Sequence, residues 1–309
     1  MSHSSFQVKG SEVVVEADVV VVGTGAGGAA AAVALARAGI KVLLVEAGPW
    51  RDPADYPVST YGAMRDMMDD WGSTITVGRA FWPVVQAKLV GGTTVINSAI
   101  CVRTPEDIFT AWQKEFGIAT GDYPEKIWAF QDQIERELHV AETEPAFMGR
   151  SNELALRGDV AAAYHGHVIR RFAKACIGSG QCLQGCKSER KQSTNLNYIP
   201  ETLARGGSML SCAPVDKVLF QGGRAIGVTG RFKHPQTGAT GAAFTARAKK
   251  AVIIAASATH SPALLRRSGL RHRAVGAWFR AHPGTGVFGL YPEVVDTNVG
   301  VTQGWSSSH

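Results

Sequence analysis

The sequence lacks the usual features of a secreted or membrane-anchored protein. Its first residues, MSHSSFQVKGSEVVVEAD, contain neither an apolar core segment nor a cleavage-site pattern, so we expect no signal peptide. The apolar stretch at 17–36 contains several glycines and Asp18, which argues against a membrane span. Cysteine is also scarce. Five cysteines, an odd number, favour free or metal-bound thiols in a reducing cytoplasm over a disulfide framework.

Charged residues are few as well, and no recognition motif for nucleic acid accompanies them. They make up 19% of the chain, against 45% hydrophobic residues, which is typical of a soluble globular protein. The net charge is +6, from 32 basic and 26 acidic residues, and part of the excess lies at 187–191 and 266–273. Such runs are usually solvated, so we expect no nucleic-acid partner. The 309 residues predict one or two domains, without internal repeats.

The N-terminal region has the pattern of a βαβ unit. The run DVVVV at 18–22 predicts a buried parallel strand, and the alanine-rich segment that stops at Gly39 predicts a helix. A second strand is predicted over 41–48 (KVLLVEAG), ending near an acidic residue. This alternation predicts an α/β fold around a parallel sheet.

The turn between the first strand and the helix carries a dinucleotide-binding motif. In GTGAGG, Gly23 permits the tight turn, Gly25 lets the backbone approach a pyrophosphate, and Gly28 lets helix and strand pack closely. The helix N-terminus would face the phosphates. Glu46, at the end of the second strand, can accept hydrogen bonds from the adenosine ribose hydroxyls. The motif predicts a dinucleotide site but does not distinguish FAD from NAD.

Four further segments resemble motifs of one enzyme family. They are AKLVGGTTVIN at 87–97, RTPEDIFTAW at 103–112, SATHSPALLRRSGL at 257–270 and GAWFRAHPGTGVFG at 276–289. All four resemble, in the same order, motifs of the glucose–methanol–choline (GMC) oxidoreductases, which are flavoenzymes that oxidise alcohols. The resemblance is greatest to bacterial members of the long-chain-alcohol and sterol type. It implies a Rossmann-like FAD-binding domain with FAD as the cofactor.

The resemblance also implies which residues contact FAD. Gly91, Gly92, Thr93 and Asn97 would lie against the flavin and its pyrophosphate, and the backbone of Val215 would contact the adenine. Three positions depart from the family pattern: Lys88 replaces an arginine, and Ser257 and Arg271 each replace a glycine. Ser257 adds a side chain where the backbone of the family passes close to FAD.

The catalytic residues cannot be assigned. In the family a histidine, with a second histidine or an asparagine, lies near the C-terminus of a considerably longer chain. None of the nine histidines matches that pair: His282 belongs to a structural HPG segment, His260 is at a variable position, and we expect His165 and His167 to be exposed. The catalytic base is therefore expected outside this chain, which we interpret as truncated within its substrate-binding domain.

Three of the cysteines lie close together in the segment CIGSGQCLQGC, where Cys176, Cys182 and Cys186 have the spacing C-x5-C-x3-C. Some GMC dehydrogenases that pass electrons to external acceptors hold a three-iron cluster with a loop of this spacing. Three readings stay open: an iron–sulfur cluster, packing thiols, and a reversible disulfide. A zinc site is disfavoured, because no fourth ligand is evident.

The rest of the chain predicts further elements. Strands at 215–220, 225–232 and 242–248 predict an antiparallel meander, and 251–258 predicts a separate buried strand. Helices are predicted over 126–140, with Ile127, Phe130, Ile134 and Leu138 on one buried face, and after Ser261 as the capping residue, with Pro262 in the first turn. A short helix is also predicted to end at Gly206.

These observations predict a domain order and a function. The FAD-binding domain would comprise 13–112 and 200–275, with a cysteine-containing insert at 113–199 and the start of a substrate-binding domain at 276–309. The predicted activity is hydride transfer from an alcohol to flavin N5, with a separate electron acceptor. Two alternatives remain: a flavin-binding but catalytically silent fragment that needs a complementing C-terminal half, and a different FAD or NAD enzyme that shares only the βαβ unit.

Overall fold

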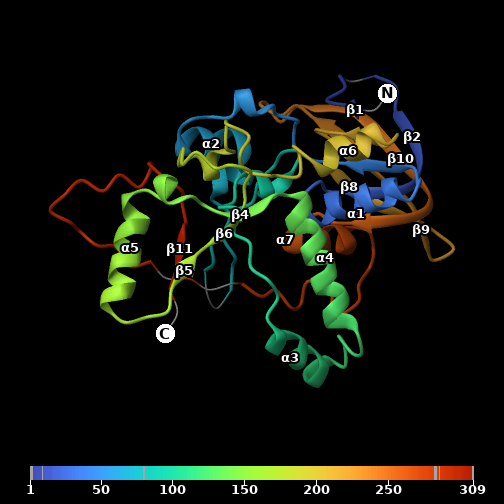
Figure 1. The fold of residues 1–309 in the computed structure, drawn as a ribbon. Helices are drawn as coiled ribbons and strands as arrows, with labels where there is room; N and C mark the ends of the chain where they lie inside the picture. Colours follow the sequence, from blue (N-terminus) through green and yellow to red (C-terminus); the bar gives the residue numbers. More distant parts are fainter. Residues whose placement is uncertain (1–2, 9, 79–80, 282–283, 285, 308–309) are drawn as a thin grey trace. The chain divides into compact units, whose positions relative to one another are not determined.

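A computed structural model describes residues 3–8, 10–78, 81–281, 284 and 286–307. The chain forms two compact units, each with its own sheets and helices (Figure 1). The first comprises residues 1–96, 183–185 and 193–289, and the second comprises residues 97–182, 186–192 and 290–309. The predicted division into an FAD-binding domain, an insert and the start of a substrate-binding domain stays a prediction about functional domains.

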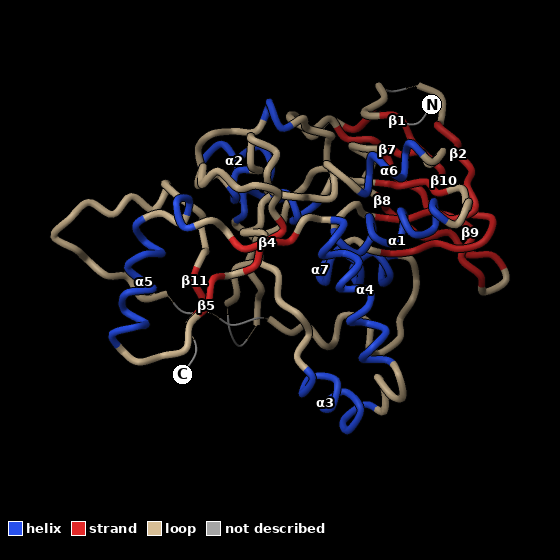
Figure 2. The backbone as a smooth tube through the Cα atoms, viewed as in Figure 1, coloured by secondary structure: helices blue, strands red, loops and turns tan. Residues whose placement is uncertain are grey.

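The first unit is built on a seven-stranded sheet, whose strands are drawn in red in Figure 2. The strands on one side of the sheet are parallel, and the last two pairs, β10 with β9 and β9 with β8, are antiparallel. In spatial order the strands are β1 (His3–Ser4), β7 (Ser208–Leu210), β3 (Val42–Val45), β2 (Val13–Val22), β10 (Thr240–Ile254), β9 (Arg224–Lys233) and β8 (Val215–Gln221). The predicted α/β fold with a small antiparallel meander is confirmed.

The apolar runs form the centre of this sheet because both of its faces are covered there. Val20, Val21, Leu43 and Leu44 are fully buried.

One prediction is wrong: the segments 242–248 and 251–258 are not separate strands. A bulge between Ala248 and Ala251 lets β10 continue as one strand that pairs with β2 on one side and with β9 on the other.

Four helices accompany this sheet: α1 (Ala26–Arg37), α2 (Thr60–Met67), α6 (Tyr198–Ala204) and α7 (Ser257–Arg267). The predicted helix before Gly206 is therefore confirmed as α6. The predicted start of α7 is wrong, since the helix begins at Ser257 rather than after Ser261; the Ser257 hydroxyl accepts a hydrogen bond from the His260 N–H at 3.2 Å. Pro262 consequently lies inside the helix, where it removes one backbone donor.

The described residues of the second unit form three α-helices and two small antiparallel sheets. The helices, drawn in green in Figure 1, are α3 (Glu106–Phe116), α4 (Tyr123–Glu137) and α5 (Arg150–Ala161). Strand β4 (Val140–Glu142) pairs with β6 (Arg170–Phe172), and β5 (His167–Val168) pairs with β11 (Trp305–Ser306).

The buried face predicted for 126–140 is wrong in one respect. Phe130 is 60% exposed, although Leu138 is buried and Ile127 and Ile134 are half-buried. Helix α4 is instead attached to the preceding segment through Trp128, whose indole N–H donates to the Thr104 carbonyl at 3.0 Å and whose ring meets that of Phe109 edge-on. An aromatic side chain with a polar N–H can bury its ring and satisfy its donor at one place, which phenylalanine cannot.

Candidate functional site

The glycine motif forms the turn between β2 and α1, and two of its glycines are required by the protein itself. Gly23 has φ +98°, a conformation that favours glycine, and a Cβ there would collide with the carbonyl of Ala255. A Cβ on Gly28 would collide with the carbonyl of Gly23, so the close packing of helix on strand depends on this glycine. Both structural roles predicted for these glycines are consistent with this geometry.

Gly25 differs from the other two because nothing in the described protein requires it. It has an extended conformation (φ −64°, ψ −172°), and no heavy atom of the described residues lies within 4 Å of its Cβ position. It is the N-cap of α1, where no side chain caps the helix and no acidic residue lies in the first turn. The first N–H groups of α1 therefore remain available to an anion. The open space and these donors fit a dinucleotide pyrophosphate.

Glu46 follows β3 and is buried with an exposure of 8%. Its Oε2 accepts from the backbone N–H of Thr24 at 2.9 Å and from the Thr24 hydroxyl at 2.6 Å, and its Oε1 accepts from the Gly48 N–H at 2.9 Å. Burial raises the pKa of Glu46, and these hydrogen bonds from Thr24 and Gly48 act in the opposite direction. The carboxyl group is thus held in a fixed orientation beside the glycine turn; its contact with the ribose stays a prediction.

Thr24 is the central polar residue of this site, and no sequence pattern indicates its role. It is fully buried, and its hydroxyl, besides donating to Glu46, accepts from the Gly91 N–H at 3.0 Å. It lies in the variable second position of the motif, which carries no sequence requirement of its own. One threonine therefore connects the glycine turn, the carboxylate and the second glycine segment.

The second glycine segment lies directly against the first. Gly91 (φ +100°) and Gly92 (φ +53°) both have left-handed conformations. A Cβ on Gly92 would lie 2.9 Å from the Cα of Gly25, so only a glycine allows this approach. The exposed Thr93 accepts from the Ala87 N–H at 3.3 Å. The structure thus brings Gly23, Gly25, Gly28, Glu46, Gly91, Gly92 and Thr93 together in the first unit.

A third segment that the sequence analysis missed completes the site. Thr194 is buried, and its hydroxyl lies 3.1 Å from the Thr24 carbonyl and 3.2 Å from the Gly91 carbonyl. Asn195, also buried, donates to the Tyr56 hydroxyl at 2.7 Å. In the sequence, the polar run STN at 193–195, separated from the cysteine segment by KSERKQ, is the signal that could have indicated this segment.

The remaining predicted residues make other contacts. Val215 begins β8 opposite Gly230, and Asn97 belongs to the second unit, where its side-chain oxygen accepts from the Ala99 N–H at 3.1 Å. Their contacts with FAD stay predictions. His165 and His167 are exposed, as predicted, and His282 lies outside the described residues.

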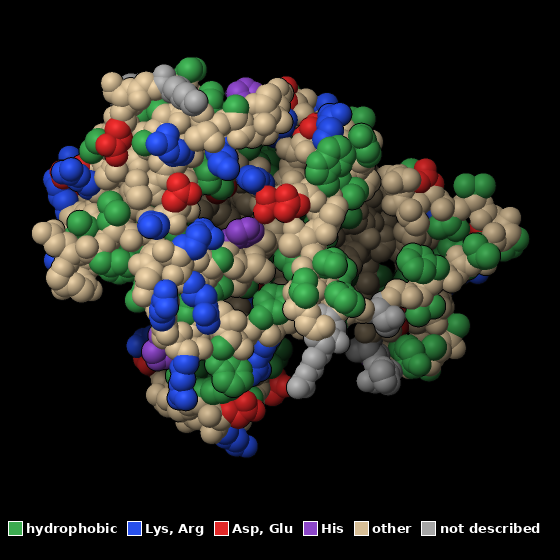
Figure 3. Space-filling view, turned by 180° about the vertical axis from the view of Figure 1, so that it is seen from behind, with side chains coloured by type: hydrophobic (Ala, Val, Ile, Leu, Met, Phe, Trp, Pro, Cys, Tyr) green, Lys and Arg blue, Asp and Glu red, His purple; other side chains and the backbone are tan. Residues whose placement is uncertain are grey.

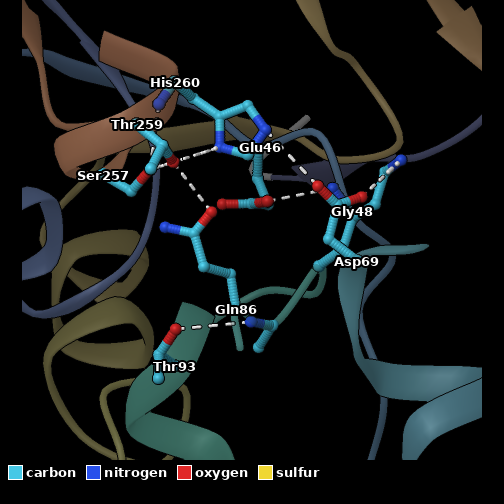
Figure 4. A network of polar contacts seen from close by, with 10 residues as sticks. Glu46, Gly48, Asp69, Gln86, Thr93, Ser257, Thr259 and His260 are labelled. Atoms are coloured by element: carbon cyan, nitrogen blue, oxygen red, sulfur yellow. Dashed lines mark hydrogen bonds and ion pairs between the residues drawn. The ribbon is translucent and has the colours of Figure 1, made fainter. Parts of the chain in front are cut away.

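A polar network connects the start of α7 with the segment before the second glycine pair (Figure 4). His260 Nε2 lies 3.3 Å from an Asp69 carboxylate oxygen, and Lys88 Nζ lies 3.2 Å from the other. The Thr259 hydroxyl donates to the Gln86 side chain at 2.9 Å. Lys88, which departs from the family pattern, keeps a positive charge here. Ser257, which replaces a glycine, has φ +78°, a conformation in which glycine would be unstrained.

This network predicts a specific acid dependence of stability. The hydrogen bond from His260, together with the charge of Lys88, lowers the pKa of Asp69 to about 2 against the opposing effect of burial. Between about pH 2 and 4, the unfolded chain binds a proton on this carboxyl group that the folded chain does not, so the free energy of unfolding rises with pH in this window. We expect Asp69→Asn to reduce the increase in the free energy of unfolding across this pH window by about 1 kcal/mol.

The measurement is urea unfolding at several pH values between 2 and 5. The exposed neighbour Asp70→Asn is the matched control, because it removes the same charge outside the network. Identical pH profiles for Asp69→Asn and the wild-type protein would contradict the role of the ion pair.

The three cysteines line one cavity within the second unit. Its lining includes Cys176, Cys182 and Cys186 together with three basic residues, Arg171, Arg190 and Lys191. All five cysteines of the chain are free thiols, so the structure contains no disulfide at this loop. Gly178, Gly180 and Gly185 have φ of +66°, +68° and +104°, so glycine is needed for the tight folding of this loop.

Basic groups contact the cysteine sulfurs. Arg171 Nη2 lies 3.0 Å from Cys182 Sγ, and the Lys191 backbone N–H donates to Cys186 Sγ at 3.3 Å. Burial raises the pKa of Cys182, but the charge and hydrogen bond of Arg171 outweigh it and the pKa is lowered. Burial lowers the pKa of Lys191 to about 8. The guanidinium of Arg171 thus favours the thiolate form of Cys182.

The arrangement of the thiols discriminates between kinds of metal centre. Among the described residues, no three His, Cys, Asp or Glu side chains gather closely enough to hold a single metal ion. A cluster holds its thiolate ligands farther apart, because its own iron and sulfide atoms occupy the centre. Three thiols around one cavity, with N–H donors to two of them, fit such a cluster. The assignment of Cys176, Cys182 and Cys186 as iron ligands stays a prediction.

Comparison with known protein families identifies the family of this chain. A family model described as GMC oxidoreductase matches residues 64–284, and one described as FAD dependent oxidoreductase matches residues 18–51. The chain belongs to the GMC oxidoreductase family. The predicted family and FAD as its cofactor are confirmed. Binding of FAD at the two glycine segments and Glu46 stays a prediction.

Individual proteins are similar to the chain in sequence, and a solved structure is similar to it in fold. The chain is 37% identical over 298 residues to an uncharacterized GMC-type oxidoreductase of Mycobacterium tuberculosis, covering 95% of this chain and 46% of that protein. It is 26% identical over 286 residues to the long-chain-alcohol oxidase FAO1 of Arabidopsis thaliana, covering 90% and 37% respectively. A solved structure of a formate oxidase variant from Aspergillus oryzae matches with a TM-score of 0.60 at 17% identity, covering 84% and 48%.

These comparisons also show how much of a GMC oxidoreductase is present. The chain spans less than half the length of each of these three proteins. None of the helices in the described part of the chain is both long enough and apolar enough to cross a membrane.

Proposed function

We propose that this chain forms the FAD-binding half of an enzyme that oxidises the CH–OH group of an alcohol. The observation that carries the proposal is the contact between the two glycine segments, Gly25 with Gly92, beside the buried carboxylate of Glu46. This geometry supports a bound FAD, and membership of the GMC oxidoreductase family supports the alcohol as the reductant. FAD, when bound, supplies the hydride acceptor at flavin N5.

The residues of this chain would bind and orient FAD rather than take part in proton transfer. The free N–H groups at the start of α1 would bind the pyrophosphate, and Glu46, fixed by Thr24 and Gly48, would accept from the ribose. The turn at Gly91 and Gly92 would let the backbone approach the cofactor without side chains. Removal of the alcohol proton needs a base, which we assign to a further segment that the longer relatives contain.

Exposed apolar side chains support the need for such a segment. Apolar side chains lie on the molecular surface in Figure 3. Several of the most exposed belong to the stretch 278–294, namely Trp278, Val287, Phe288, Leu290 and Val294, with exposures from 76% to 102%. Clusters of exposed apolar residues usually mark interaction surfaces. We therefore propose that a C-terminal half, as a continuation or as a separate chain, covers this stretch and completes the substrate site.

The visible spectrum tests this proposal. The chain is purified with FAD and mixed anaerobically with 1-dodecanol, alone and after co-expression with the C-terminal half of a longer relative. We expect flavin absorption in both samples and bleaching by the alcohol only in the second. A chain that binds NADH but no FAD would contradict the proposal, and bleaching by the chain alone would contradict the need for a second half.

The substrate, acceptor and location follow as parts of the same proposal. Similarity to a protein named as a long-chain-alcohol oxidase favours a bulky apolar alcohol over a sugar. A dehydrogenase that passes electrons to a separate acceptor is favoured over an oxidase by the cysteine cavity. The free cysteines are consistent with a reducing cytoplasm.

We further propose that Cys176, Cys182 and Cys186 hold an iron–sulfur cluster. Support comes from their shared cavity and from the N–H donors to the sulfurs of Cys182 and Cys186. A cluster of this kind supplies one-electron transfer. The loop contributes the three sulfurs and the backbone turns at its glycines that let them face one cavity.

A cysteine substitution tests the cluster. We expect Cys182→Ser to lose most of the iron and acid-labile sulfide of the purified protein, because a serine hydroxyl is a poor ligand for iron in such clusters. Cys101→Ser is the matched control: Cys101 is a half-buried free thiol of the same unit outside the cavity. Equal iron content in both variants would contradict the assignment.

A further inference from the structure

Arg171 has an unusual environment for a charged residue. It is the middle residue of β6, and its exposure is only 1%. Its Nε and Nη2 donate to the Ser98 carbonyl at 3.2 and 2.8 Å. On the other side its guanidinium faces the cysteine cavity, with Nη2 3.0 Å from Cys182 Sγ and Nη1 4.0 Å from Cys176 Sγ. One guanidinium thus contacts two of the three cavity sulfurs.

The charge of this guanidinium needs compensation. Arginine remains protonated in proteins, and a buried charge is costly unless an opposite charge or a full set of acceptors accompanies it. Among the described residues, the acceptors of Arg171 are one carbonyl and two cysteine sulfurs, and none is a carboxylate. The described lining of the cavity contains Arg171, Arg190 and Lys191 and no acidic residue. The cavity is therefore suited to a group of net negative charge.

The neighbouring arginine gives a direct comparison. Arg170 precedes Arg171 on the same strand and is exposed, and its guanidinium pairs with Glu135 at 2.7 Å. Successive side chains of a strand point to opposite faces, so the two arginines have different surroundings although their backbones are adjacent. Of these two arginines, Arg171 contacts cavity sulfurs, whereas the guanidinium of Arg170 pairs with Glu135.

We propose that Arg171 positions the cluster ligands Cys176 and Cys182 and raises the reduction potential of the cluster by compensating its negative charge. The inference rests on the proposed cluster. A thiolate-ligated cluster becomes more negative when it takes up an electron, so a buried positive charge beside its sulfurs stabilises the reduced form. Hydrogen bonds to the ligand sulfurs act in the same direction.

A redox titration monitored by electron paramagnetic resonance tests this role. Iron and sulfide content and the spectrum of the wild-type protein are measured first, and the reduced fraction is then followed with dithionite as the one-electron reductant. At the wild-type midpoint, we expect Arg171→Gln to lower the ratio of reduced to oxidised cluster at least tenfold, a shift of about 59 mV to more negative potential. Arg171→Lys, which keeps the charge, should shift less.

Arg170→Gln is the matched control, since it removes the same charge from the adjacent residue, and we expect less than a threefold change. If Arg171→Gln does not fold, Arg171→Lys is compared with Arg170→Gln instead. Arg171→Lys keeps the charge but loses the contact of one guanidinium with two sulfurs. Its midpoint potential should therefore still shift more than that of Arg170→Gln. A wild-type protein with iron whose midpoint is unchanged in the Arg171 variants would overturn this inference alone. A wild-type protein without iron or sulfide would overturn both the proposed cluster and the inference.

Discussion

Replacing Gly25 by alanine is expected to weaken FAD binding at least tenfold, or by about 1.4 kcal/mol, while leaving the FAD-free fold intact. The Cβ position of Gly25 faces open space at the N-terminus of α1, and its φ of −64° is ordinary for any residue. The added methyl group therefore strains nothing in the described protein. It would occupy the space in which the pyrophosphate approaches the backbone.

Titration of the FAD-free protein with FAD, followed by flavin fluorescence, measures this affinity, and thermal unfolding measures the fold. Gly158→Ala is the matched control, because Gly158 lies in α5 and its Cβ position is also open. We expect that variant to bind FAD as the wild-type protein does. Unchanged FAD affinity in Gly25→Ala would show that the pyrophosphate does not lie at this turn.

Replacing Thr24 by valine is expected to destabilise the FAD-free protein by about 2–4 kcal/mol. The substitution preserves the shape of a fully buried side chain but removes its hydroxyl. Glu46 then loses the donor at 2.6 Å, and the Gly91 N–H loses its acceptor at 3.0 Å. Each unsatisfied buried group costs about 1–3 kcal/mol, and more where a charge is involved.

Urea unfolding at neutral pH measures this loss of stability. Thr24→Ser keeps the hydroxyl and loses only a methyl group, so we expect it to cost about 1 kcal/mol. If the valine and serine variants are equally stable, the Thr24 hydroxyl does not connect Glu46 to the second glycine segment in the way described here.

The glycine residues of the site could be predicted because their requirement is local. Gly23 and Gly28 are needed by the turn that joins one strand to one helix, and both positions lie within six consecutive residues. Gly91 and Gly92 came from a resemblance to a family motif. Gly23, Gly91 and Gly92 have left-handed backbone conformations that favour glycine, and at Gly28 a Cβ would collide with the Gly23 carbonyl.

Thr24, Thr194 and Asn195 could not be predicted, because their roles depend on contacts between distant segments. Thr194 lies far along the chain from Thr24, yet its hydroxyl lies 3.1 Å from the Thr24 carbonyl. A threonine beside a glycine turn is compatible with many environments. Only the fold determines that this one is fully buried and hydrogen-bonded to a carboxylate.

The errors in predicted elements have similar causes. Residues Lys249 and Lys250 interrupted the apolar pattern and suggested two strands, whereas the bulge accommodates them within β10. For α7, Pro262 suggested a first turn, but the helix already begins at Ser257. In both cases the local preference of the residues did not determine where the element begins or ends.

The position of β10 in the sheet has a consequence for synthesis of the protein on the ribosome. Strand β2 pairs with β10 along nearly its whole length, and the Ala255 N–H, just after β10, donates to the Val22 carbonyl at 2.8 Å. At about 5–20 residues per second, β10 follows β2 by tens of seconds, during which that edge of β2 has no native partner. Unpaired apolar edges promote aggregation, so the nascent chain needs protection during this interval. The glycine turn between β2 and α1, where a Cβ on Gly23 would collide with the Ala255 carbonyl after β10, is consequently among the last parts of the first unit to form.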